Sequence, residues 1–461
     1  MRKLAILACI SLVAVGGGAR FTSASFTTAT SVGSNSLTVD QLSNYFSVTP
    51  ISSAASGNVD NLSLNFGTIA SARTLTSVFR VTNVSGSTQT AVLTLASVPQ
   101  ISSVVFASSG SSSATLAAGA STTVSVTTSS TVCGHGSGTL KLGKSGLSWM
   151  YRTYSVAIDE APEAPGTPTV TQKPAGRLDV AWAASSTTTN LAGYDLYRSA
   201  NGGASYTKLN SSTLTGLTYS DTATTDGTSY MYKVQALSTD TPALTSLFSA
   251  TATGVADATA PTQPTAVSLT NGGGAGNAYI NGGNASSISV SVTLAAGWLS
   301  TDTVTLTVQS GSSIITRTAS PSSGTVSFTG IDVSGFGEGA VSFSATSTDA
   351  DGNVSGGRVA SYVKDTVAPA APSASYVDKN NSTADQITGT TEANASISIT
   401  QTLPGAGSFS GSANGSGSYT INVAAVNGSG GHPTAVSYSV RATDVAGNTS
   451  GATAVNLNDT K

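Results

Sequence analysis

One acidic turn has the residue types and the spacing of a cation site. Asp349-Ala-Asp351-Gly-Asn353 places three oxygen-bearing side chains at alternate positions around a glycine. Calcium loops begin with this spacing, and their carboxylate and amide oxygens coordinate the ion. No Glu follows at the closing position, so the complete loop pattern is absent. A tight turn in which Asp and Asn bond their own backbone is the alternative interpretation.

Cys133 and His135, separated by Gly134, are a second pair of residues that could carry out chemistry. A cysteine nucleophile needs a base within reach and a third group that orients this base. Residues i and i+2 of a strand share a face, so the thiol and the imidazole could meet. No partner signature accompanies them. We therefore interpret Cys133 as a small buried apolar residue, with pairing between molecules as the alternative.

Other catalytic patterns are missing from the sequence. Cys9 belongs to the apolar N-terminal stretch that we expect to be cleaved, and the two His and one Cys that remain cannot build a credible zinc site. The carboxylates lack the paired arrangement of a glycosidase, and no nucleophile elbow, phosphate loop or dinucleotide fingerprint precedes a helix. We predict that the protein is not an enzyme and requires no cofactor, with calcium at 349–353 as the candidate ion.

The elements that must position these groups are short strands. Ile288-Ser-Val-Ser-Val292 and Thr303-Val-Thr-Leu-Thr-Val308 alternate apolar and hydroxyl residues, and Asn271-Gly-Gly-Gly is typical of the turns between such runs. Of the 461 residues, 39% are hydrophobic and only 9% are charged, so the strands bury one face and expose hydroxyls on the other. This pattern predicts an all-β protein made of sandwiches.

The charge balance limits the partners. The net charge is −3 and no basic stripe occurs, so we expect no nucleic-acid partner. We also expect no membrane span in the mature chain. The remaining partner classes are an extracellular protein or glycan ligand, or a second copy of the chain.

The N-terminus has the pattern of a signal peptide. Arg2 and Lys3 precede an apolar stretch over 4–15, and small residues follow over 16–19. The apolar stretch is too short to span a bilayer. We predict a signal peptide over 1–24, cleaved after Ala19 or Ala24, and therefore an extracellular or cell-surface location.

One phrase recurs along the second half of the chain. It reads Asp257-Ala-Thr-Ala-Pro261, then Asp365-Thr-Val-Ala-Pro369, and Asp459-Thr460-Lys461 repeats its beginning. A boundary that recurs after about 100 residues indicates modules in a linear array. We place the modules at 26–160, 163–256, 259–366 and 367–461.

Region 163–256 resembles a fibronectin type III module. Leu178-Asp-Val-Ala-Trp182 matches its second strand, with Trp182 at the core tryptophan position. Gly227-Thr-Ser-Tyr230 begins a later strand, with Tyr230 at the tyrosine-corner position. The resemblance implies a sandwich in which the phenol of Tyr230 ties the preceding connection to the backbone.

Regions 259–366 and 367–461 resemble the bacterial Ig-like repeats of large surface adhesins. They share the Asp-x-x-Ala-Pro openings and the closing turns 349–353 and Asp444-Val-Ala-Gly-Asn448. The resemblance implies that Asp365, in the boundary phrase, shares an ion with Asp349, Asp351 and Asn353. The second turn lacks the middle Asp and is the weaker ion candidate. The strand order in the middle of 259–366 stays open.

Region 26–160 resembles the Ig-like module of abnormal-spindle and hydin-type proteins. Its markers are Leu64-Asn-Phe-Gly67, Phe79-Arg-Val-Thr-Asn83 and Leu116-Ala-Ala-Gly119. Phe21-Thr-Ser-Ala-Ser-Phe-Thr27 is similar to the mature start of camelysin and biofilm-fibre proteins. In that family an N-terminal strand completes a neighbour's sheet, which would assign this role to 20–48. We interpret 20–48 instead as the first strand of its own module, with donation to a neighbour as the alternative.

We therefore predict tandem Ig-like and fibronectin type III sandwiches in an exported, non-enzymatic adhesin or stalk of the cell surface or extracellular matrix. A filament subunit joined by donation of the 20–48 strand is one alternative. A carbohydrate-binding accessory protein is another, and it needs an exposed aromatic cluster. Trp149, Tyr151 and Tyr154 are the dense candidates, but a regular strand separates Tyr154 from the other two.

Overall fold

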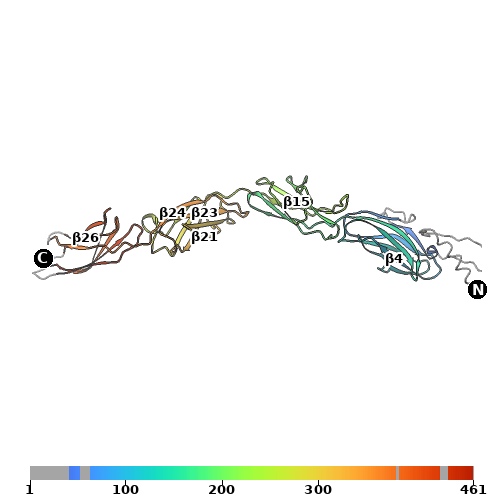
Figure 1. Ribbon diagram of the computed structural model, residues 1–461, viewed down its shortest axis with the longest axis horizontal. Coiled ribbons are helices and arrows are strands. Elements are labelled where there is room, and N and C mark those ends of the chain that lie inside the picture. Colours follow the sequence, from blue (N-terminus) through green and yellow to red (C-terminus); the bar gives the residue numbers. More distant parts are fainter. Residues whose placement is uncertain (1–40, 52–62, 380–383, 426–433, 460–461) are drawn as a thin grey trace, which may run out of the picture. The chain divides into compact units, whose positions relative to one another are not determined.

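The computed structural model describes residues 41–51, 63–379, 384–425 and 434–459 (Figure 1). Within these ranges the chain consists of strands, turns and three short 3-10 helices. The all-β prediction is confirmed. The predicted signal peptide and the 21–27 resemblance lie outside the described residues.

The chain divides into two compact units. One runs to Gln172 and includes Leu178–Ala256, and the other comprises Lys173–Arg177 and Asp257–Lys461. Each unit contains two pairs of β-sheets, and each pair encloses its own hydrophobic cluster. Every such pair falls within one of the four predicted module ranges. The module boundaries themselves stay a prediction.

The first module, 26–160, holds a four-stranded and a five-stranded sheet. Their orders are β1-β3-β7-β5 and β2-β9-β8-β4-β6. Strand β9 pairs antiparallel with β8 and parallel with β2. The elements are η1 (Leu42–Asn44), β1 (Phe46–Pro50), β2 (Ser63–Ile69), β3 (Thr74–Asn83), β4 (Gln89–Ala96), β5 (Ile101–Phe106), β6 (Ser113–Leu116), β7 (Ser121–Thr128), β8 (Gly134–Lys144) and β9 (Leu147–Glu160).

Asn83 connects two of the sequence markers of this module. Its side chain is fully buried at the end of β3, and its Nδ2 lies 2.9 Å and 3.0 Å from the carbonyl oxygens of Leu116 and Ala117. The amide of Gly119 donates back to the Asn83 carbonyl at 3.0 Å. Gly119 has a φ of 72°, which favours glycine in this turn. The Asn that ends β3 therefore holds the Leu-x-x-Gly turn in place.

The fibronectin-like module, 163–256, holds a three-stranded and a four-stranded sheet, β10-β11-β14 and β13-β12-β15-β16. Trp182 is 5% exposed and meets Tyr194 edge-on, with ring centroids 5.9 Å apart. The elements are β10 (Thr169–Gln172), η3 (Pro174–Gly176), β11 (Leu178–Ala181), β12 (Leu191–Ser199), β13 (Thr207–Lys208), β14 (Thr218–Asp221), β15 (Ser229–Ser238) and β16 (Ala252–Val255).

The third module, 259–366, settles the strand order that the sequence left open. Its sheets are β17-β19-β22 and β18-β24-β23-β20-β21, and the short β18 pairs parallel with β24. The labelled β21, β23 and β24 belong to one sheet (Figure 1). The elements are β17 (Ala266–Leu269), η4 (Ala275–Asn277), β18 (Tyr279–Ile280), β19 (Ile288–Thr293), β20 (Thr303–Ser310), β21 (Ser313–Ala319), β22 (Thr325–Ile331), β23 (Gly339–Thr348) and β24 (Arg358–Lys364).

The fourth module, 367–461, repeats the fibronectin-like arrangement of three and four strands. Its sheets are β25-β26-β29 and β28-β27-β30-β31. Alternate residues of β30 are buried, which places Val436, Tyr438, Val440 and Ala442 in the core. The elements are β25 (Ser375–Val377), β26 (Asp385–Thr390), β27 (Ser396–Leu403), β28 (Gly407–Ser412), β29 (Ser418–Val423), β30 (Thr434–Thr443) and β31 (Thr453–Asp459).

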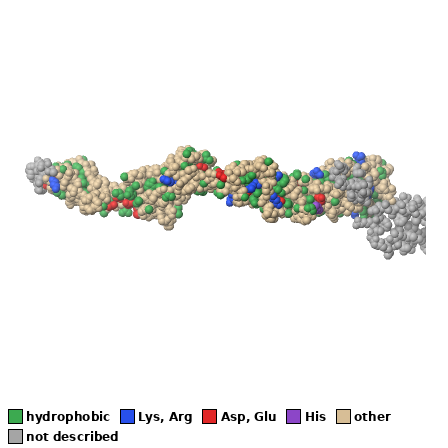
Figure 2. Space-filling view, turned by 90° about the horizontal axis from the view of Figure 1, so that it is seen from above, with side chains coloured by type: hydrophobic (Ala, Val, Ile, Leu, Met, Phe, Trp, Pro, Cys, Tyr) green, Lys and Arg blue, Asp and Glu red, His purple; other side chains and the backbone are tan. Residues whose placement is uncertain are grey.

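The surface is poor in charge. On the face shown in Figure 2, Lys, Arg, Asp and Glu form scattered spots among uncharged polar side chains and backbone. Uncharged side chains and backbone therefore supply most of the polar surface on this face. In the part of the chain that the structure describes, no helix has the length and apolar character needed to cross a membrane.

The tyrosine corner gives a test of the fibronectin-like module. The Thr225 amide donates to the Tyr230 phenol oxygen at 2.9 Å, across the connection between β14 and β15. Tyr230→Phe removes this acceptor and leaves the amide without its partner. We expect the free energy of unfolding to fall by about 1–2 kcal/mol in urea denaturation followed by fluorescence.

The matched control for this test is Tyr206→Phe. It removes a phenol from the same module, where the Tyr206 ring faces the Lys233 ammonium at 4.1 Å. We expect this control to unfold like the wild type. Equal stability of the two variants would show that the phenol of Tyr230 does not support the corner.

Candidate functional site

The predicted calcium turn forms a compact hydrogen-bonded loop between β23 and β24. The Asp349 Oδ1 accepts from the amides of Asp351 at 2.9 Å and Asn353 at 2.8 Å. Its Oδ2 accepts from the Asn353 side-chain Nδ2 at 2.9 Å. The Asp349 carboxylate is thus engaged by the loop itself, as in the tight-turn interpretation.

Asp351 lies beside other acidic groups in this loop. Burial raises the pKa of the Asp351 carboxyl, and the negative charges of Asp257 and Asp349 raise this pKa further. Clustered carboxylates disfavour ionisation unless a cation or a donor neutralises them. Calcium at Asp349, Asp351 and Asn353 stays a prediction.

Asp365 does not join this loop. Asp349 follows β23 and Asp365 follows β24, and these strands pair antiparallel with Gly339 opposite Lys364 and Ala345 opposite Arg358. The two Asp residues therefore leave opposite ends of the hairpin, about 30 Å apart for a strand of this length. The expectation that Asp365 shares an ion with 349–353 is wrong for this reason. The boundary residue close to the loop is Asp257, whose carbonyl accepts from the Asn353 Nδ2 at 3.2 Å.

The turn between β30 and β31 has the same internal geometry. The Asp444 Oδ1 accepts from the Asn448 amide at 2.8 Å, and Oδ2 accepts from the Asn448 Nδ2 at 2.9 Å. Asp365 lies at this turn, because its carbonyl accepts from the Asn448 Nδ2 at 2.8 Å. Asp365 therefore takes part through its backbone. The sequence repeat predicts both turns. It does not show that their Asn side chains donate to the backbone carbonyl of the boundary Asp.

Cys133 and His135 do not meet. Strand β8 begins only at Gly134, whose φ of 108° breaks the alternation on which contact depends. The Cys133 side chain is fully buried, with Sγ 3.3 Å from the Asn190 carbonyl oxygen. His135 is exposed, and its Nδ1 lies 2.6 Å from Asp159 Oδ1, a hydrogen bond that raises the pKa of the imidazole. Burial raises the pKa of the Cys133 thiol to about 11, which disfavours the reactive thiolate.

The segment around Cys133 instead contacts the fibronectin-like module within the first unit. The Asn190 Nδ2 donates to the Cys133 carbonyl at 3.0 Å, and the Thr187 hydroxyl donates to the Ser130 carbonyl at 3.1 Å. Val132 and Thr189 form a parallel bridge. Backbone groups of the first module are therefore satisfied by loop residues that precede β12.

Glu160, at the end of β9, is a buried carboxylic acid that sequence reasoning missed. Its side chain is inaccessible to solvent, and its Oε1 accepts from the Thr128 hydroxyl at 3.2 Å. Its Oε2 has no hydrogen-bond partner. Burial raises the pKa of this carboxyl to about 7. A Glu at an inward position of an alternating strand was the available signal in the sequence.

The raised pKa of Glu160 makes the stability of the first module depend on pH. Between the ordinary value of 4.5 and about 7, the folded state keeps a proton that the unfolded state has lost. The free energy of unfolding therefore falls as pH rises through this window and stays low above it. We expect Glu160→Gln to remove this fall and to stabilise the module at pH 8 by up to about 3 kcal/mol.

Hydrogen exchange of β8 and β9 at pH 4, 6 and 8 measures this effect. Glu392→Gln, at an exposed position of the fourth module, is the matched control and should leave the profile of β8 and β9 unchanged. A Glu160→Gln protein with the same pH profile as the wild type would refute the role of this carboxyl.

The aromatic residues of β9 separate as a regular strand requires. Trp149 and Tyr151 are 62% and 47% exposed. Tyr154 is fully buried and stacks on Phe79, with ring centroids 5.8 Å apart. The Lys141 ammonium lies 4.4 Å from the centroid of the Tyr151 ring. Two exposed rings share one face, and Trp149 is the more accessible of the two.

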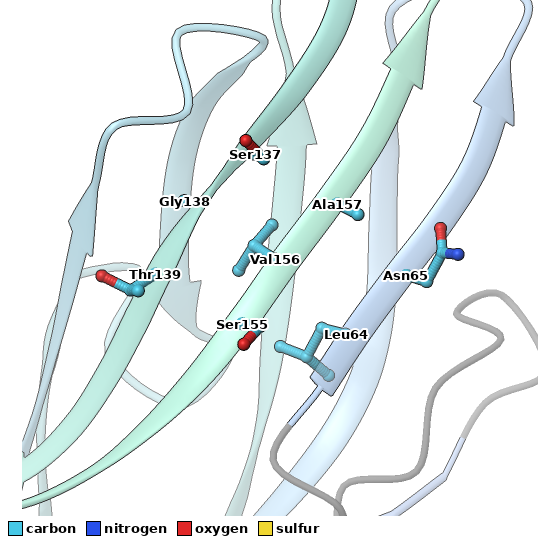
Figure 3. A pocket seen from close by; sticks show the side chains of 8 residues that line it. All are labelled: Leu64, Asn65, Ser137, Gly138, Thr139, Ser155, Val156 and Ala157. Atoms are coloured by element: carbon cyan, nitrogen blue, oxygen red, sulfur yellow. The ribbon is translucent and has the colours of Figure 1, made fainter. Parts of the chain in front are cut away.

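A hollow on the first module offers little for catalysis. Strands β2, β8 and β9 supply its small and polar lining residues, which include Asn65, Ser137 and Ser155 (Figure 3). No acidic, basic or thiol side chain lines it. Across the described ranges, no group of three or more His, Cys, Asp or Glu residues is arranged to hold a metal ion.

Comparison with known proteins identifies one module by sequence. Residues 368–459 match the family model of the bacterial Ig domain, which confirms the prediction for the fourth module. A segment of 85 residues is 39% identical to chitinase 63 of Streptomyces plicatus. That alignment covers 18% of this chain and 13% of the chitinase, so it spans only a small part of the enzyme.

Comparison with solved structures found matches to an adhesin and to proteins with fibronectin type III domains. A calcium-stabilised adhesin of an Antarctic bacterium is 18% identical over 90% of this chain and 98% of its own, with a TM-score of 0.31. The FN1–FN3 domains of chicken CNTN1 are 14% identical over 65% of this chain and 100% of their own, with a TM-score of 0.30. A Fn3-like protein of Clostridium thermocellum is 26% identical over 20% of this chain and 90% of its own, with a TM-score of 0.17.

Proposed function

We propose that this protein is an exported, non-enzymatic adhesin or stalk of the bacterial cell surface or extracellular matrix. The observation that carries the proposal is the hydrogen-bonded connection of successive sandwiches within each unit. In the second unit, Asn448 of the fourth module binds the backbone of Asp365, and in the first unit Asn190 binds the backbone of Cys133. Such connections suit a protein whose task is to present modules in series.

The match of residues 368–459 to the bacterial Ig domain supports this proposal. The composition supports it as well, because the face in Figure 2 is poor in charge and the sequence is rich in Ser and Thr. We expect the partner of this surface to be an extracellular protein or glycan. The N-terminal pattern of residues 1–24 supports export.

A fractionation experiment tests the location and the role together. We expect antibodies against the fourth module to detect the protein in the medium or on intact cells, where added protease removes it. Deleting the gene should reduce attachment of the cells to surfaces, and complementation should restore it. A protein found only inside intact cells, with unchanged attachment after deletion, would contradict the proposal.

The filament alternative depends on an N-terminal strand that completes another copy. In the described part of 20–48, β1 pairs antiparallel with β3 of its own module, and Phe46 lies opposite Asn83. The Phe46 side chain is 3% exposed and belongs to the core of that module. This pairing favours the interpretation of β1 as the first strand of its own sheet. Filaments of the purified protein in negative-stain electron microscopy would favour the alternative.

A carbohydrate-binding role is the second candidate, because Trp149 and Tyr151 are exposed on one face of β9. Exposed rings of this kind can stack on sugars, and the partial likeness to a chitinase makes chitin the first polysaccharide to try. If this role holds, Trp149→Ala should abolish sedimentation of the protein with insoluble chitin.

The matched control for the chitin experiment is Trp298→Ala, which removes the partly buried tryptophan of the third module. Circular dichroism must show that the first module of the Trp149→Ala protein stays folded. Failure of the wild type to bind chitin, or equal binding by wild type and Trp149→Ala, would show that Trp149 does not bind this polysaccharide.

A further inference from the structure

Two linkers of the second unit are built alike around an Asp. The Oδ1 atoms of Asp257 and Asp365 accept from the amides of Thr259 at 2.8 Å and Val367 at 3.2 Å. Each side chain thus forms a turn with the residue two positions later. The carbonyl oxygen of each Asp is left to accept from elsewhere, and in both linkers it accepts from an Asn side chain.

Asn448 makes three connections at the junction between the third and fourth modules. Its Nδ2 lies 2.8 Å from the Asp365 carbonyl oxygen and 2.9 Å from the Asp444 Oδ2. Its Oδ1 accepts from the Gly282 amide at 2.8 Å. Asn448 is only 7% exposed, so water competes little for these hydrogen bonds.

A second contact reinforces this junction from the third module. The Asn281 Nδ2 donates to the Ala446 carbonyl at 2.9 Å. A side chain at Gly447, whose φ is 96°, would place its Cβ 2.9 Å from this Nδ2. The close approach of the loop around 281–282 to the turn 444–448 therefore requires glycine at 447.

The same set of hydrogen bonds recurs at Asn353. Its Nδ2 contacts the Asp257 carbonyl oxygen at 3.2 Å and the Asp349 Oδ2 at 2.9 Å, and its Oδ1 accepts from the Ala175 amide at 2.8 Å. Asn353 is 5% exposed. Two turns of related sequence thus use their final Asn in the same way, which shows that the arrangement belongs to the repeat.

The Asn amide joins two oxygen atoms that would otherwise face each other unpaired. A carboxylate oxygen and a carbonyl oxygen are typical ligands of a calcium ion. Here the two N–H groups of one neutral amide satisfy both, and the amide oxygen binds a third group. No cation has to be brought to the junction.

We propose that the Asn448 side chain couples the third and fourth modules without a metal ion, in the position that a bridging cation would occupy. Coupling then depends on an amide donor, and calcium leaves the geometry of this junction unchanged. The coupling by Asn448 depends neither on the ligand that the protein binds nor on the location of the protein.

Asn448→Asp is the sharpest test, because it keeps the shape of the side chain and removes both N–H donors. It also places a new carboxylate next to Asp444 and the Asp365 carbonyl. We expect the modules to uncouple in chelator. Calcium should restore coupling of this variant in part, because the three oxygen groups can then share an ion.

Spin labels on the full chain measure the coupling as a distance distribution. Ser327→Cys in β22 and Ser410→Cys in β28 are exposed labelling positions in the two modules. Cys9→Ser removes one of the two native thiols, and the other, Cys133, is buried. We expect one narrow peak for this labelled reference protein, unchanged between calcium and chelator, and loss of that peak for Asn448→Asp in chelator.

Two further variants keep the test informative if Asn448→Asp unfolds the fourth module. Gly282→Pro removes the opposing N–H donor from the third module, and it should broaden the peak while the fourth module stays folded. Asn456→Asp, at an exposed position of β31, is the matched control and should keep the narrow peak. A reference peak that broadens in chelator, or a narrow peak for both Asn448→Asp and Gly282→Pro in chelator, would overturn the proposal.

Discussion

Each sandwich must bury enough apolar surface to stay folded by itself. Cys133 is the one cysteine among the described residues, and it is free, so no disulfide reinforces a module there. The separate clusters around Phe79, Trp182, Phe343 and Tyr438 supply this burial, one for each pair of sheets. Most of the large apolar side chains lie in these clusters. The hydrogen-bonded connections between modules use backbone groups and small polar side chains.

The connections within the two units satisfy the same requirement with different residues. Carbonyl oxygens at the end of a module need donors once the next module excludes water from them. Asn190 provides a donor to Cys133 in the first unit, and Asn448 provides one to Asp365 in the second. An Asn amide has both donor and acceptor groups and carries no charge. It can therefore serve a partly buried junction without the desolvation cost of an ion pair.

The sequence predicted the strands well because burial alternates along them. Val124, Val290 and Leu306 are all buried at the inward positions that the pattern indicates. It predicted Trp182 and Tyr230 correctly because the fibronectin-like motif fixes their places in the core. It did not predict which turn Asp365 contacts, because the direction of the strands decides at which end of the hairpin this residue lies. Nor did it separate Cys133 from His135, because the backbone turn at Gly134 breaks the alternation.

The parallel strand pairs have a mechanical consequence. Strand β18 pairs with β24, the last strand of the third module, and β2 pairs with β9, the last strand of the first module. In both cases the second strand of the module along the chain runs alongside its last strand. Tension between these two strands pulls them in opposite directions along their length, which loads their hydrogen bonds together in shear. An antiparallel hairpin pulled at its open end would instead release its hydrogen bonds one after another. The parallel pairs therefore place their interstrand hydrogen bonds in shear when tension reaches both strands of a pair.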